Sequence, residues 1–164
     1  MYRIGTGMDV HAFAPDRQLM LGCVAVDHPV GLQGHSDADV LVHAITDAIL
    51  GALGERDIGW FYPPDDPQWK GYPGSRFLRD MKKLLGERGY QVVNLDAVIM
   101  AEHPKLSPYI PRMTAQIAEH LGVTTDRIGI KATTSEGLGF TGRGDGILAN
   151  AVVLLKRNPA DVTA

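Results

Sequence analysis

The sequence predicts an α+β fold in which helices cover one face of a mixed β-sheet, within a single domain that spans residues 1–164. Two observations predict this class. The chain contains both segments with the two-residue alternation of strands and segments with the apolar spacing of helices. These segments alternate too irregularly for a doubly wound parallel sheet, and no repeat or low-complexity linker divides the chain. A chain of 164 residues can bury a complete core of this kind.

The first third of the chain is expected to form two extended segments and a helix. Residues 3–13 and 18–26 have strand-like composition, with turn residues at 14–16 between them. Ser36 and Asp39 resemble a capping box, with Ser36 as the N-cap of the helix that follows. The apolar face of this helix is expected to consist of Leu41, Ala44, Ile45, Ala48, Ile49 and Ala52. Its polar face is expected to carry Asp39, His43, Thr46 and Asp47.

The middle of the chain is expected to contain a long loop, a second helix and a strand. Residues 57–74 are rich in Pro, Gly and Asp, which predicts a loop. Ser75 is expected to cap the second helix, and Gly89 to end it. Residues 90–101 alternate as a strand does. The apolar side of this strand is expected to consist of Val93, Leu95, Ala97 and Ile99.

A third helix and two strands are expected to complete the fold. The helix begins near Pro108 or Pro111 and runs to Leu121. The strands cover residues 127–133 and 147–157, and a glycine-rich segment connects them.

Composition and charge exclude several classes of function. A net charge of −3 gives no electrostatic reason to expect binding of nucleic acid or of an anionic membrane. The N-terminus lacks the layout of a signal peptide, and the apolar runs fall short of the roughly 18 residues that span a bilayer. We therefore expect a complete cytoplasmic protein. The single cysteine, Cys23, excludes an internal disulfide and is expected to be a structural thiol, not a nucleophile.

Asp9 and His11 are the clearest candidates for metal ligands. Residues i and i+2 of a strand point to the same face, so this carboxylate and this imidazole converge. His43, on the polar face of the first helix, is the best candidate for a third ligand, and an Asp–His–His set with one open position is typical of catalytic zinc. Asp39 and Asp47 are candidates to orient the His43 imidazole. Such an Asp-x-His triplet also arises by chance, in which case these residues are ordinary surface polar groups.

Two further polar clusters suit a phosphate. His35 and Ser36 precede a helix start, where free amides favour anions, although a plain helix cap explains them as well. Residues 131–136 place a lysine, three hydroxyls and a carboxylate at a strand end, which suits a phosphate with its divalent cation. The alternative for this segment is a strand end rich in β-branched residues. Dinucleotide-binding, P-loop and G-x-S-x-G patterns are absent from the sequence.

Five motifs, taken together, are similar to one known family. The motifs are RIGTGMDVHAF, GHSDADVLVHAITDAILGA, DIGWFYPPDDP, HPKLSPYIPRM and IKATTSEGLGFTGRGDGI. In order and spacing the chain resembles, over nearly its whole length, the 2-C-methyl-D-erythritol 2,4-cyclodiphosphate synthase family of the non-mevalonate isoprenoid pathway. The resemblance implies conversion of 4-diphosphocytidyl-2-C-methyl-D-erythritol 2-phosphate to the cyclic diphosphate, with release of CMP.

The resemblance also implies roles for individual residues. Asp9, His11 and His43 would bind Zn²⁺, and Glu136 would hold a second divalent cation, Mg²⁺ or Mn²⁺. His35 and Thr134 would lie near the phosphates and aid the transition state. The residues implied to contact the substrate are Ser36, Asp57, Ile58, Gly59, Asp66, Ala101, Pro104, Lys105, Leu106, Ala132, Thr133, Ser135, Phe140 and Arg143. The resemblance further implies a homotrimer in which neighbouring subunits share each active site.

Two departures from the family pattern limit what the resemblance implies. Pro64 stands where the family commonly has a carboxylate, so it is not expected to take part in the chemistry. Asp145 replaces a glutamate and Met8 a common aromatic residue at the central trimer cavity, so binding of an isoprenoid diphosphate there is not expected. The residues leave two other functions open: a zinc phosphoesterase that activates water at the open position, and a nucleotide-binding module without catalysis.

Overall fold

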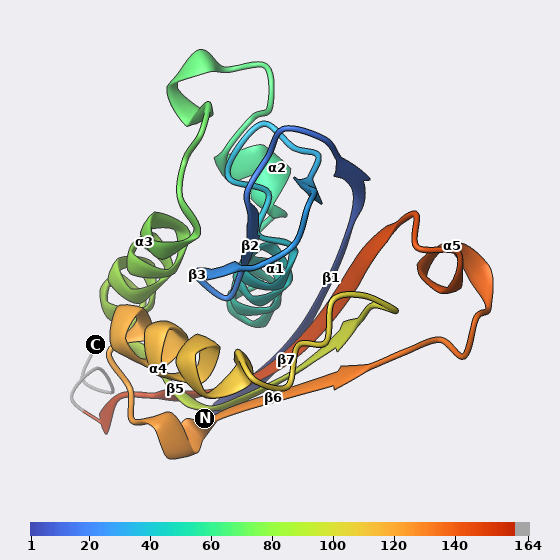
Figure 1. Cartoon of the computed structure of the whole chain (residues 1–164). Coiled ribbons are helices and arrows are strands. Elements are labelled where there is room, and N and C mark those ends of the chain that lie inside the picture. Colours follow the sequence, from blue (N-terminus) through green and yellow to red (C-terminus); the bar gives the residue numbers. More distant parts are fainter. Residues whose placement is uncertain (160–164) are drawn as a thin grey trace.

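The computed structural model describes residues 1–159 and has helices on one face of a five-stranded mixed sheet (Figure 1). The strands lie in the order β4-β1-β7-β5-β6, with β5 and β6 parallel and the other neighbours antiparallel. The strands are β1 (Tyr2–Ala14), β4 (Gly31–Leu32), β5 (Tyr90–Met100), β6 (Ile128–Thr133) and β7 (Gly146–Arg157). The predicted fold class is confirmed.

The helices vary widely in length. The helices are α1 (Val40–Leu53), α2 (Ile58–Phe61), α3 (Gly74–Glu87), α4 (Ile110–Leu121) and α5 (Gly139–Gly142), with the 3₁₀ turns η1 (Pro67–Trp69) and η2 (Thr125–Arg127). α1 is the central one and is buried on nearly every side. Its predicted polar face is therefore not a solvated one: Thr46 is fully buried and donates its hydroxyl hydrogen to the Val42 carbonyl at 2.8 Å. Among the described residues, no helix combines the length and the hydropathy that crossing a membrane requires.

Two glycines of β1 allow α1 to lie unusually close to the sheet. A Cβ atom on Gly5 would lie 2.1 Å from the Ala48 carbonyl oxygen, and one on Gly7 would lie 2.1 Å from that of Ala44. Any side chain at either position would therefore push the helix away. Asp9 and His11 follow Gly5 and Gly7 on the same face of β1, so the close approach brings both under α1.

The predicted segment 18–26 is a hairpin, not one extended strand. β2 (Leu19–Leu21) and β3 (Val24–Val26) pair antiparallel across Gly22 and Cys23. Both turn residues have positive φ, 57° and 62°, as a tight two-residue hairpin turn requires. Burial and the nearby Asp39 charge raise the pKa of Cys23, which agrees with a structural thiol.

Both predicted N-caps, Ser36 and Ser75, are wrong. Asp39, not Ser36, is the N-cap of α1, and its carboxylate accepts hydrogen bonds from the backbone N–H groups of Val42, Gly22 and Cys23. One buried carboxylate thus joins the helix start to the hairpin turn, which no local pattern signals. α3 starts at Gly74, one residue before the predicted cap Ser75, and its N-cap makes no side-chain hydrogen bond.

The buried face of β5 differs from the predicted one at its start. Val92, Leu95, Ala97 and Ile99 face the core, whereas Val93 is only partly buried. A bulge between Val92 and Asn94 shifts the register against β7 by one residue and reverses the alternation there. The predicted loop 57–74 also contains α2 and η1.

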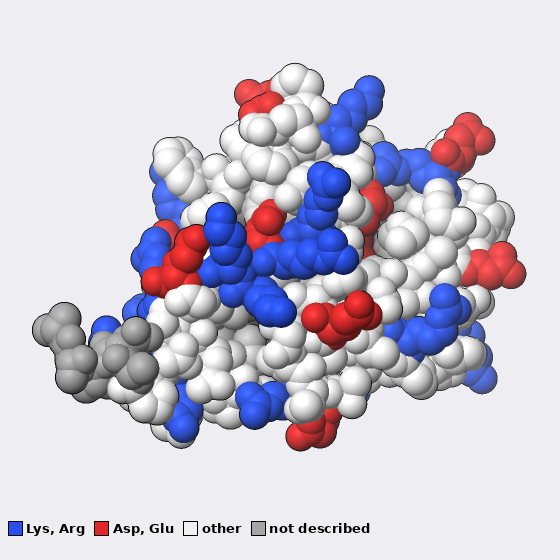
Figure 2. All heavy atoms as spheres, turned by 90° about the vertical axis from the view of Figure 1, so that its left-hand side faces the viewer, with Lys and Arg blue, Asp and Glu red and all other residues white. Residues whose placement is uncertain are grey.

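The two faces of the sheet differ in how they are covered. The large apolar side chains exposed on the face away from the helices are Tyr2, Ile4, Met8, Val10 and Val152. The α3 and α4 side in Figure 2 instead carries charges of both signs, such as the pair formed by Lys83 and Glu87 on α3. The helical side is thus an ordinary solvated surface, while the bare sheet face carries most of the exposed large apolar side chains, together with the Lys131–Asp96 ion pair.

Candidate active site

One carboxylate and two imidazoles meet between β1 and α1. Asp9 Oδ2 lies 2.8 Å from His11 Nε2 and 3.0 Å from His43 Nδ1, and these two imidazole nitrogens are 3.1 Å apart. Two elements that are distant in the sequence therefore direct three potential ligand atoms at one point. This group could hold a metal ion.

Hydrogen bonds behind the cluster determine which nitrogen of each imidazole faces it. His11 Nδ1 lies 2.5 Å from the Gln33 carbonyl oxygen, which only accepts, so Nδ1 carries the proton and Nε2 presents a lone pair. His43 Nε2 lies 3.0 Å from the Ser36 hydroxyl oxygen, which leaves Nδ1 to face Asp9. Partners of this kind orient metal-binding imidazoles.

The electrostatics of the cluster favour positive charge at its centre. Burial alone raises the pKa of Asp9, but the hydrogen bonds and charges of His11 and His43 outweigh burial and lower this pKa far below its usual range. Burial alone lowers the pKa of His11, but the Asp9 carboxylate raises it above its ordinary value. The lone pairs of these oxygen and nitrogen atoms repel one another. A bound cation would relieve this repulsion, as bound protons do in its absence.

The donor set fits a divalent cation. Tetrahedral zinc with bonds of about 2.0–2.1 Å would separate its ligand atoms by about 3.3 Å, close to the spacing found here. The ligands are nitrogen and oxygen only, and three protein ligands leave a fourth position open, as catalytic sites require. Asp39 and Asp47 do not orient His43 as predicted: Asp39 caps α1, and Asp47 accepts a hydrogen bond from the Ile58 backbone N–H at 2.7 Å.

The Asp9–His11–His43 cluster opens into a cavity of about 220 Å³. His35 is exposed on its rim, with Nε2 3.3 Å from the Asp66 carbonyl oxygen. The predicted site residues that line this cavity are Asp9, His11, His35, Ser36, His43, Ile58 and Gly59. Its remaining walls, Tyr62, Pro64, Trp69 and Phe77, are mostly aromatic, so the cavity is apolar beside a strongly polar centre.

A second group of predicted residues lines a different cavity, of about 460 Å³. This cavity lies between the loop that follows β5 and the C-terminal end of β6. The predicted residues that line it are Ala101, Pro104, Lys105, Leu106, Ala132, Thr133 and Thr134. Within one chain, the predicted site residues are thus divided between two cavities.

The other predicted site residues line neither cavity. Asp57 caps α2, and Asp66 caps η1. Glu136 is exposed, with Oε1 3.3 Å from the Thr134 hydroxyl. The Ser135 hydroxyl accepts a hydrogen bond from Thr141 and donates one to the Leu138 carbonyl, each at 2.7 Å, so it is already engaged within its own loop.

Phe140 and Arg143, the last of the predicted residues, lie in and just after α5. Phe140 is partly buried. The Arg143 guanidinium pairs with Asp145, with Nη2 2.9 Å from Oδ2.

Two positioning residues were missed by the sequence analysis. The Arg17 guanidinium donates to the carbonyl oxygens of Gly34, at 2.6 Å, and Ser36, at 2.7 Å, and so holds the segment that carries His35. Trp69 forms part of the metal-site cavity, packed edge-to-face against Tyr62 and Tyr72. The predicted 57–74 loop contains Trp69, but nothing in the sequence connects Arg17 with residues 34–36.

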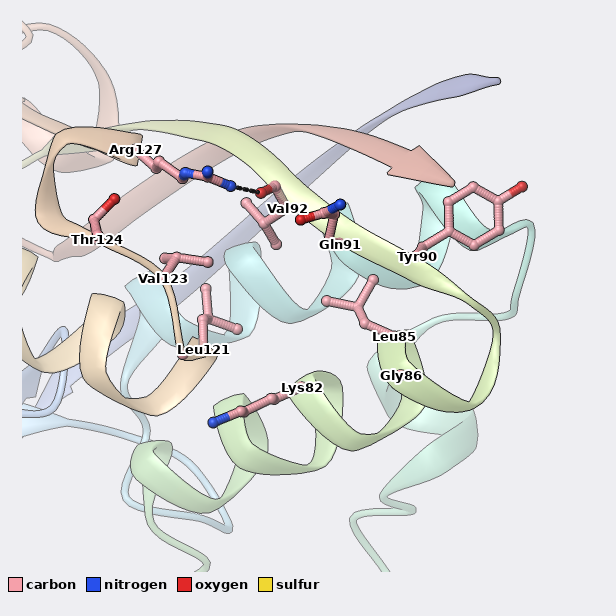
Figure 3. Close-up of a pocket in the computed structure, with 11 residues that line it drawn as sticks. Lys82, Leu85, Gly86, Tyr90, Gln91, Val92, Leu121, Val123, Thr124 and Arg127 are labelled. Carbon is pink, nitrogen blue, oxygen red and sulfur yellow. Dashed lines mark hydrogen bonds between the residues drawn. The ribbon is translucent and has the colours of Figure 1, made fainter. Parts of the chain in front are cut away.

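A third cavity, of about 490 Å³, lies away from the Asp9–His11–His43 cluster (Figure 3). It is bounded by the end of α3, the start of β5 and the turn after α4. Arg127 donates to the Val92 carbonyl at 2.9 Å, and the Lys82 side chain packs over Gly122 at the C-terminal end of α4. The Arg127 cation is therefore engaged in the fold, and no acidic, histidine or cysteine side chain lines this cavity.

The fold and the site define an α+β protein in which a cluster of side chains that could hold a metal ion opens into a ligand-sized cavity. Residues 2–156 match the family model described as the YgbB family, and the chain belongs to this family.

Relatives are similar over nearly their whole length. The chain is 54% identical over 157 residues to the 2-C-methyl-D-erythritol 2,4-cyclodiphosphate synthase of Syntrophotalea carbinolica, covering 96% of both chains. It is 56% identical over 155 residues to the synthase of Geobacter metallireducens, covering 94% of this chain and 99% of that one. Among solved structures, the CDP complex of IspF from Plasmodium falciparum matches with a TM-score of 0.84 and 32% identity, over 96% of this chain and 97% of that one.

Proposed function

We propose that the protein converts 4-diphosphocytidyl-2-C-methyl-D-erythritol 2-phosphate to 2-C-methyl-D-erythritol 2,4-cyclodiphosphate and CMP. The Asp9–His11–His43 cluster, with two imidazole nitrogens and a carboxylate oxygen aimed at one point beside a cavity, is the observation that carries this proposal. Relatives above 50% identity bear the name of this synthase, and a structural neighbour was solved with CDP. The reaction makes this protein a lyase of isoprenoid precursor biosynthesis.

The resident metals belong to the same proposal. Zn²⁺ suits the cluster because two neutral imidazoles and one carboxylate are its usual ligands in open catalytic sites. Mg²⁺ or Mn²⁺, which prefer oxygen ligands, suit the exposed Glu136 carboxylate and the phosphates of a bound substrate. Cations held at these two places would supply Lewis-acid polarisation of the phosphoryl oxygens.

The chain's own residues act by positioning and by charge. One oxygen of the substrate's 2-phosphate forms a bond to the β-phosphorus, and the bond from that phosphorus to the bridging oxygen of CMP breaks, with the electron pair leaving on CMP. The attacking phosphate is already ionised near neutral pH, so no protein base is required. His35, on the rim of the metal cavity, and Thr134, at the end of β6, donate hydrogen bonds to the phosphates in this scheme.

The proposed nucleotide contacts divide in the same way as the cavities. Lys105 and the surrounding 101–106 segment, with Ala132 and Thr133, form the wall proposed to hold the cytosine and the α-phosphate. Asp57 and Gly59, at α2, are proposed to hold the ribose. The remaining residues proposed to contact the substrate are Ser36, Ile58, Asp66, Ser135, Phe140 and Arg143.

We also propose that the active protein is a homotrimer with sites between subunits. One substrate must contact both cavities, which a neighbouring subunit's 101–106 and 132–136 segments would permit. The exposed apolar row along β1, including Ile4, Met8 and Val10, is the kind of surface that oligomers bury.

The test is phosphorus NMR of the purified protein with the substrate, Zn²⁺ and Mg²⁺, repeated after chelation. We expect CMP and a cyclic diphosphate, both abolished by the chelator. CMP accompanied only by linear phosphates would replace the proposal with a zinc phosphoesterase. Binding of a cytidine nucleotide without turnover, under every metal supplement, would replace it with a binding module.

A further inference from the structure

Glu102 joins two segments that belong to different parts of the site. It lies in the loop after β5, next to Ala101, and it lines the cavity of the 101–107 loop. Its Oε1 atom is 3.1 Å from the Ser135 backbone nitrogen and 3.2 Å from that of Gly137. The Ser135 hydroxyl is also near, at 3.3 Å, but its single proton points to the closer Leu138 carbonyl at 2.7 Å. The hydrogen-bond donors to the Glu102 carboxylate are therefore the backbone N–H groups of Ser135 and Gly137, and not the Ser135 hydroxyl.

The segment held by Glu102 has a backbone that needs such support. Glu136, between the two donor residues, has a φ of 52°, in the left-handed region that a residue with a Cβ rarely occupies. Gly137 follows with a φ of 78°. Hydrogen bonds from backbone N–H groups to a carboxylate are stronger than neutral ones, so Glu102 stabilises this conformation directly.

The conformation sets where two functional side chains lie. With Glu136 in the left-handed region, its carboxylate Oε1 comes to 3.3 Å from the Thr134 hydroxyl, and its own N–H lies 3.3 Å from the same hydroxyl oxygen. These residues carry the second-cation and phosphate roles proposed above. Glu102 itself belongs to the loop that forms the wall proposed for the base.

We propose that Glu102 is a positioning residue that couples base binding to cation binding. A pyrimidine nucleotide seated against residues 101–106 orders the Glu102 carboxylate, which then holds residues 134–137 in the arrangement that binds the divalent cation. This inference rests on the proposed function for the nucleotide, for the base wall and for the cation role of Glu136. The observation that carries it is that one carboxylate lines the cavity and also accepts hydrogen bonds from the backbone of residues 135 and 137.

The experiment measures the Kd of CDP by calorimetry without and with Mg²⁺, on zinc-loaded protein, in the wild type, Glu102→Ala and Glu102→Gln. The ratio of the two Kd values measures the coupling, because linked sites change each other's affinity by one common factor. For Glu102→Ala we expect this ratio to fall by about tenfold, the effect typical of losing a charge-assisted hydrogen bond. Glu102→Gln keeps the acceptor oxygen, so we expect it to retain most of the wild-type ratio. Glu119→Ala, on α4, is the control.

Each other outcome overturns the proposal. An unchanged ratio in Glu102→Ala, with CDP bound more weakly in both conditions, would make Glu102 a part of the base wall alone. A Gln variant as impaired as the Ala variant would mean that the negative charge itself contacts the ligand or its cation. If Glu102→Ala does not fold, Glu102→Asp takes its place, because its shorter side chain withdraws the carboxylate from the two N–H groups and should lower the ratio in the same direction. Absence of CMP production by the wild type would contradict the proposed reaction, while the Kd ratio would still test the coupling.

Discussion

The Asp9–His11–His43 cluster and the 134–137 segment hold their functional groups in place in opposite ways. The cluster lies between β1 and α1, where two glycines bring the helix onto the strand, and each imidazole is held from behind by Gln33 or Ser36. The 134–137 segment follows a strand end, is largely exposed, and is held by Glu102. His43 is only 8% exposed, so its orientation is set before any ligand arrives.

This difference indicates how the two regions should respond to change. A preorganised buried cluster loses its function outright when one ligand is removed, because the remaining groups cannot move to compensate. In an exposed segment with few contacts, the loss of one group can be compensated by a higher ligand concentration, because ligand binding orders the segment. The predictions below test that contrast, from the largest expected effect to the smallest.

His43→Ala should abolish tightly bound zinc and lower turnover by about 10³-fold or more, because metal polarisation of a phosphoryl oxygen contributes several kcal/mol. Metal analysis and CMP release measure the two effects, and circular dichroism should report a retained fold. His28→Ala, a histidine outside both cavities, is the matched control. Unchanged zinc stoichiometry in His43→Ala would refute the ligand assignment.

Glu136→Ala should lower turnover by about 10²-fold at low Mg²⁺, the scale of removing one group that stabilises transition-state charge. High Mg²⁺ or Mn²⁺ should restore part of the activity, and the zinc content should stay unchanged. A titration of rate against metal concentration measures this, with Glu87→Ala on α3 as the control. Full activity at low metal would contradict the proposed role of Glu136, and absence of any rescue would remove the contrast with His43.

Mixing the His43→Ala and Glu136→Ala variants at low Mg²⁺ should restore activity. If each site takes its cluster from one subunit and residues 132–136 from the next, random mixed trimers regain about a quarter of the wild-type sites. The mixture is prepared by co-refolding or co-expression and assayed for CMP. Mixtures no more active than the separate variants would place both halves of the site in one chain.

Ser36→Ala should weaken zinc binding by about tenfold, the lower end of the effect of removing a partner that orients a ligand. The cavity, the donor atoms and the fold remain, so competition with a chelator of known affinity is the suitable measurement. Ser75→Ala in α3, which removes a hydroxyl outside both cavities, should leave zinc affinity unchanged. Equal zinc affinity in Ser36→Ala and wild type would mean that packing alone orients the His43 imidazole.

Much of the fold was predictable because its signals are local. The alternation of β1, the apolar spacing of α1 and α3, and the glycine-rich connection before β7 all read directly from neighbouring residues. In two places where the prediction was wrong, a distant contact had decided the outcome. Asp39 takes the cap position from Ser36 because its carboxylate also binds the hairpin turn at residues 22–23. The bulge in β5 likewise depends on its pairing with β7.

The sequence by itself determined that Asp9 and His11 share one face of a strand, because side chains two positions apart in an extended chain always do. The same period places Gly5 and Gly7 on that face, so the chain also encodes the room for a helix there. Tertiary structure alone decided that α1 fills this room, that the candidate His43 reaches Asp9 and His11, and that Ser36 and not Asp39 or Asp47 contacts its far nitrogen. Spacing along the chain fixes directions within one element, whereas distances between elements follow only from how their side chains pack.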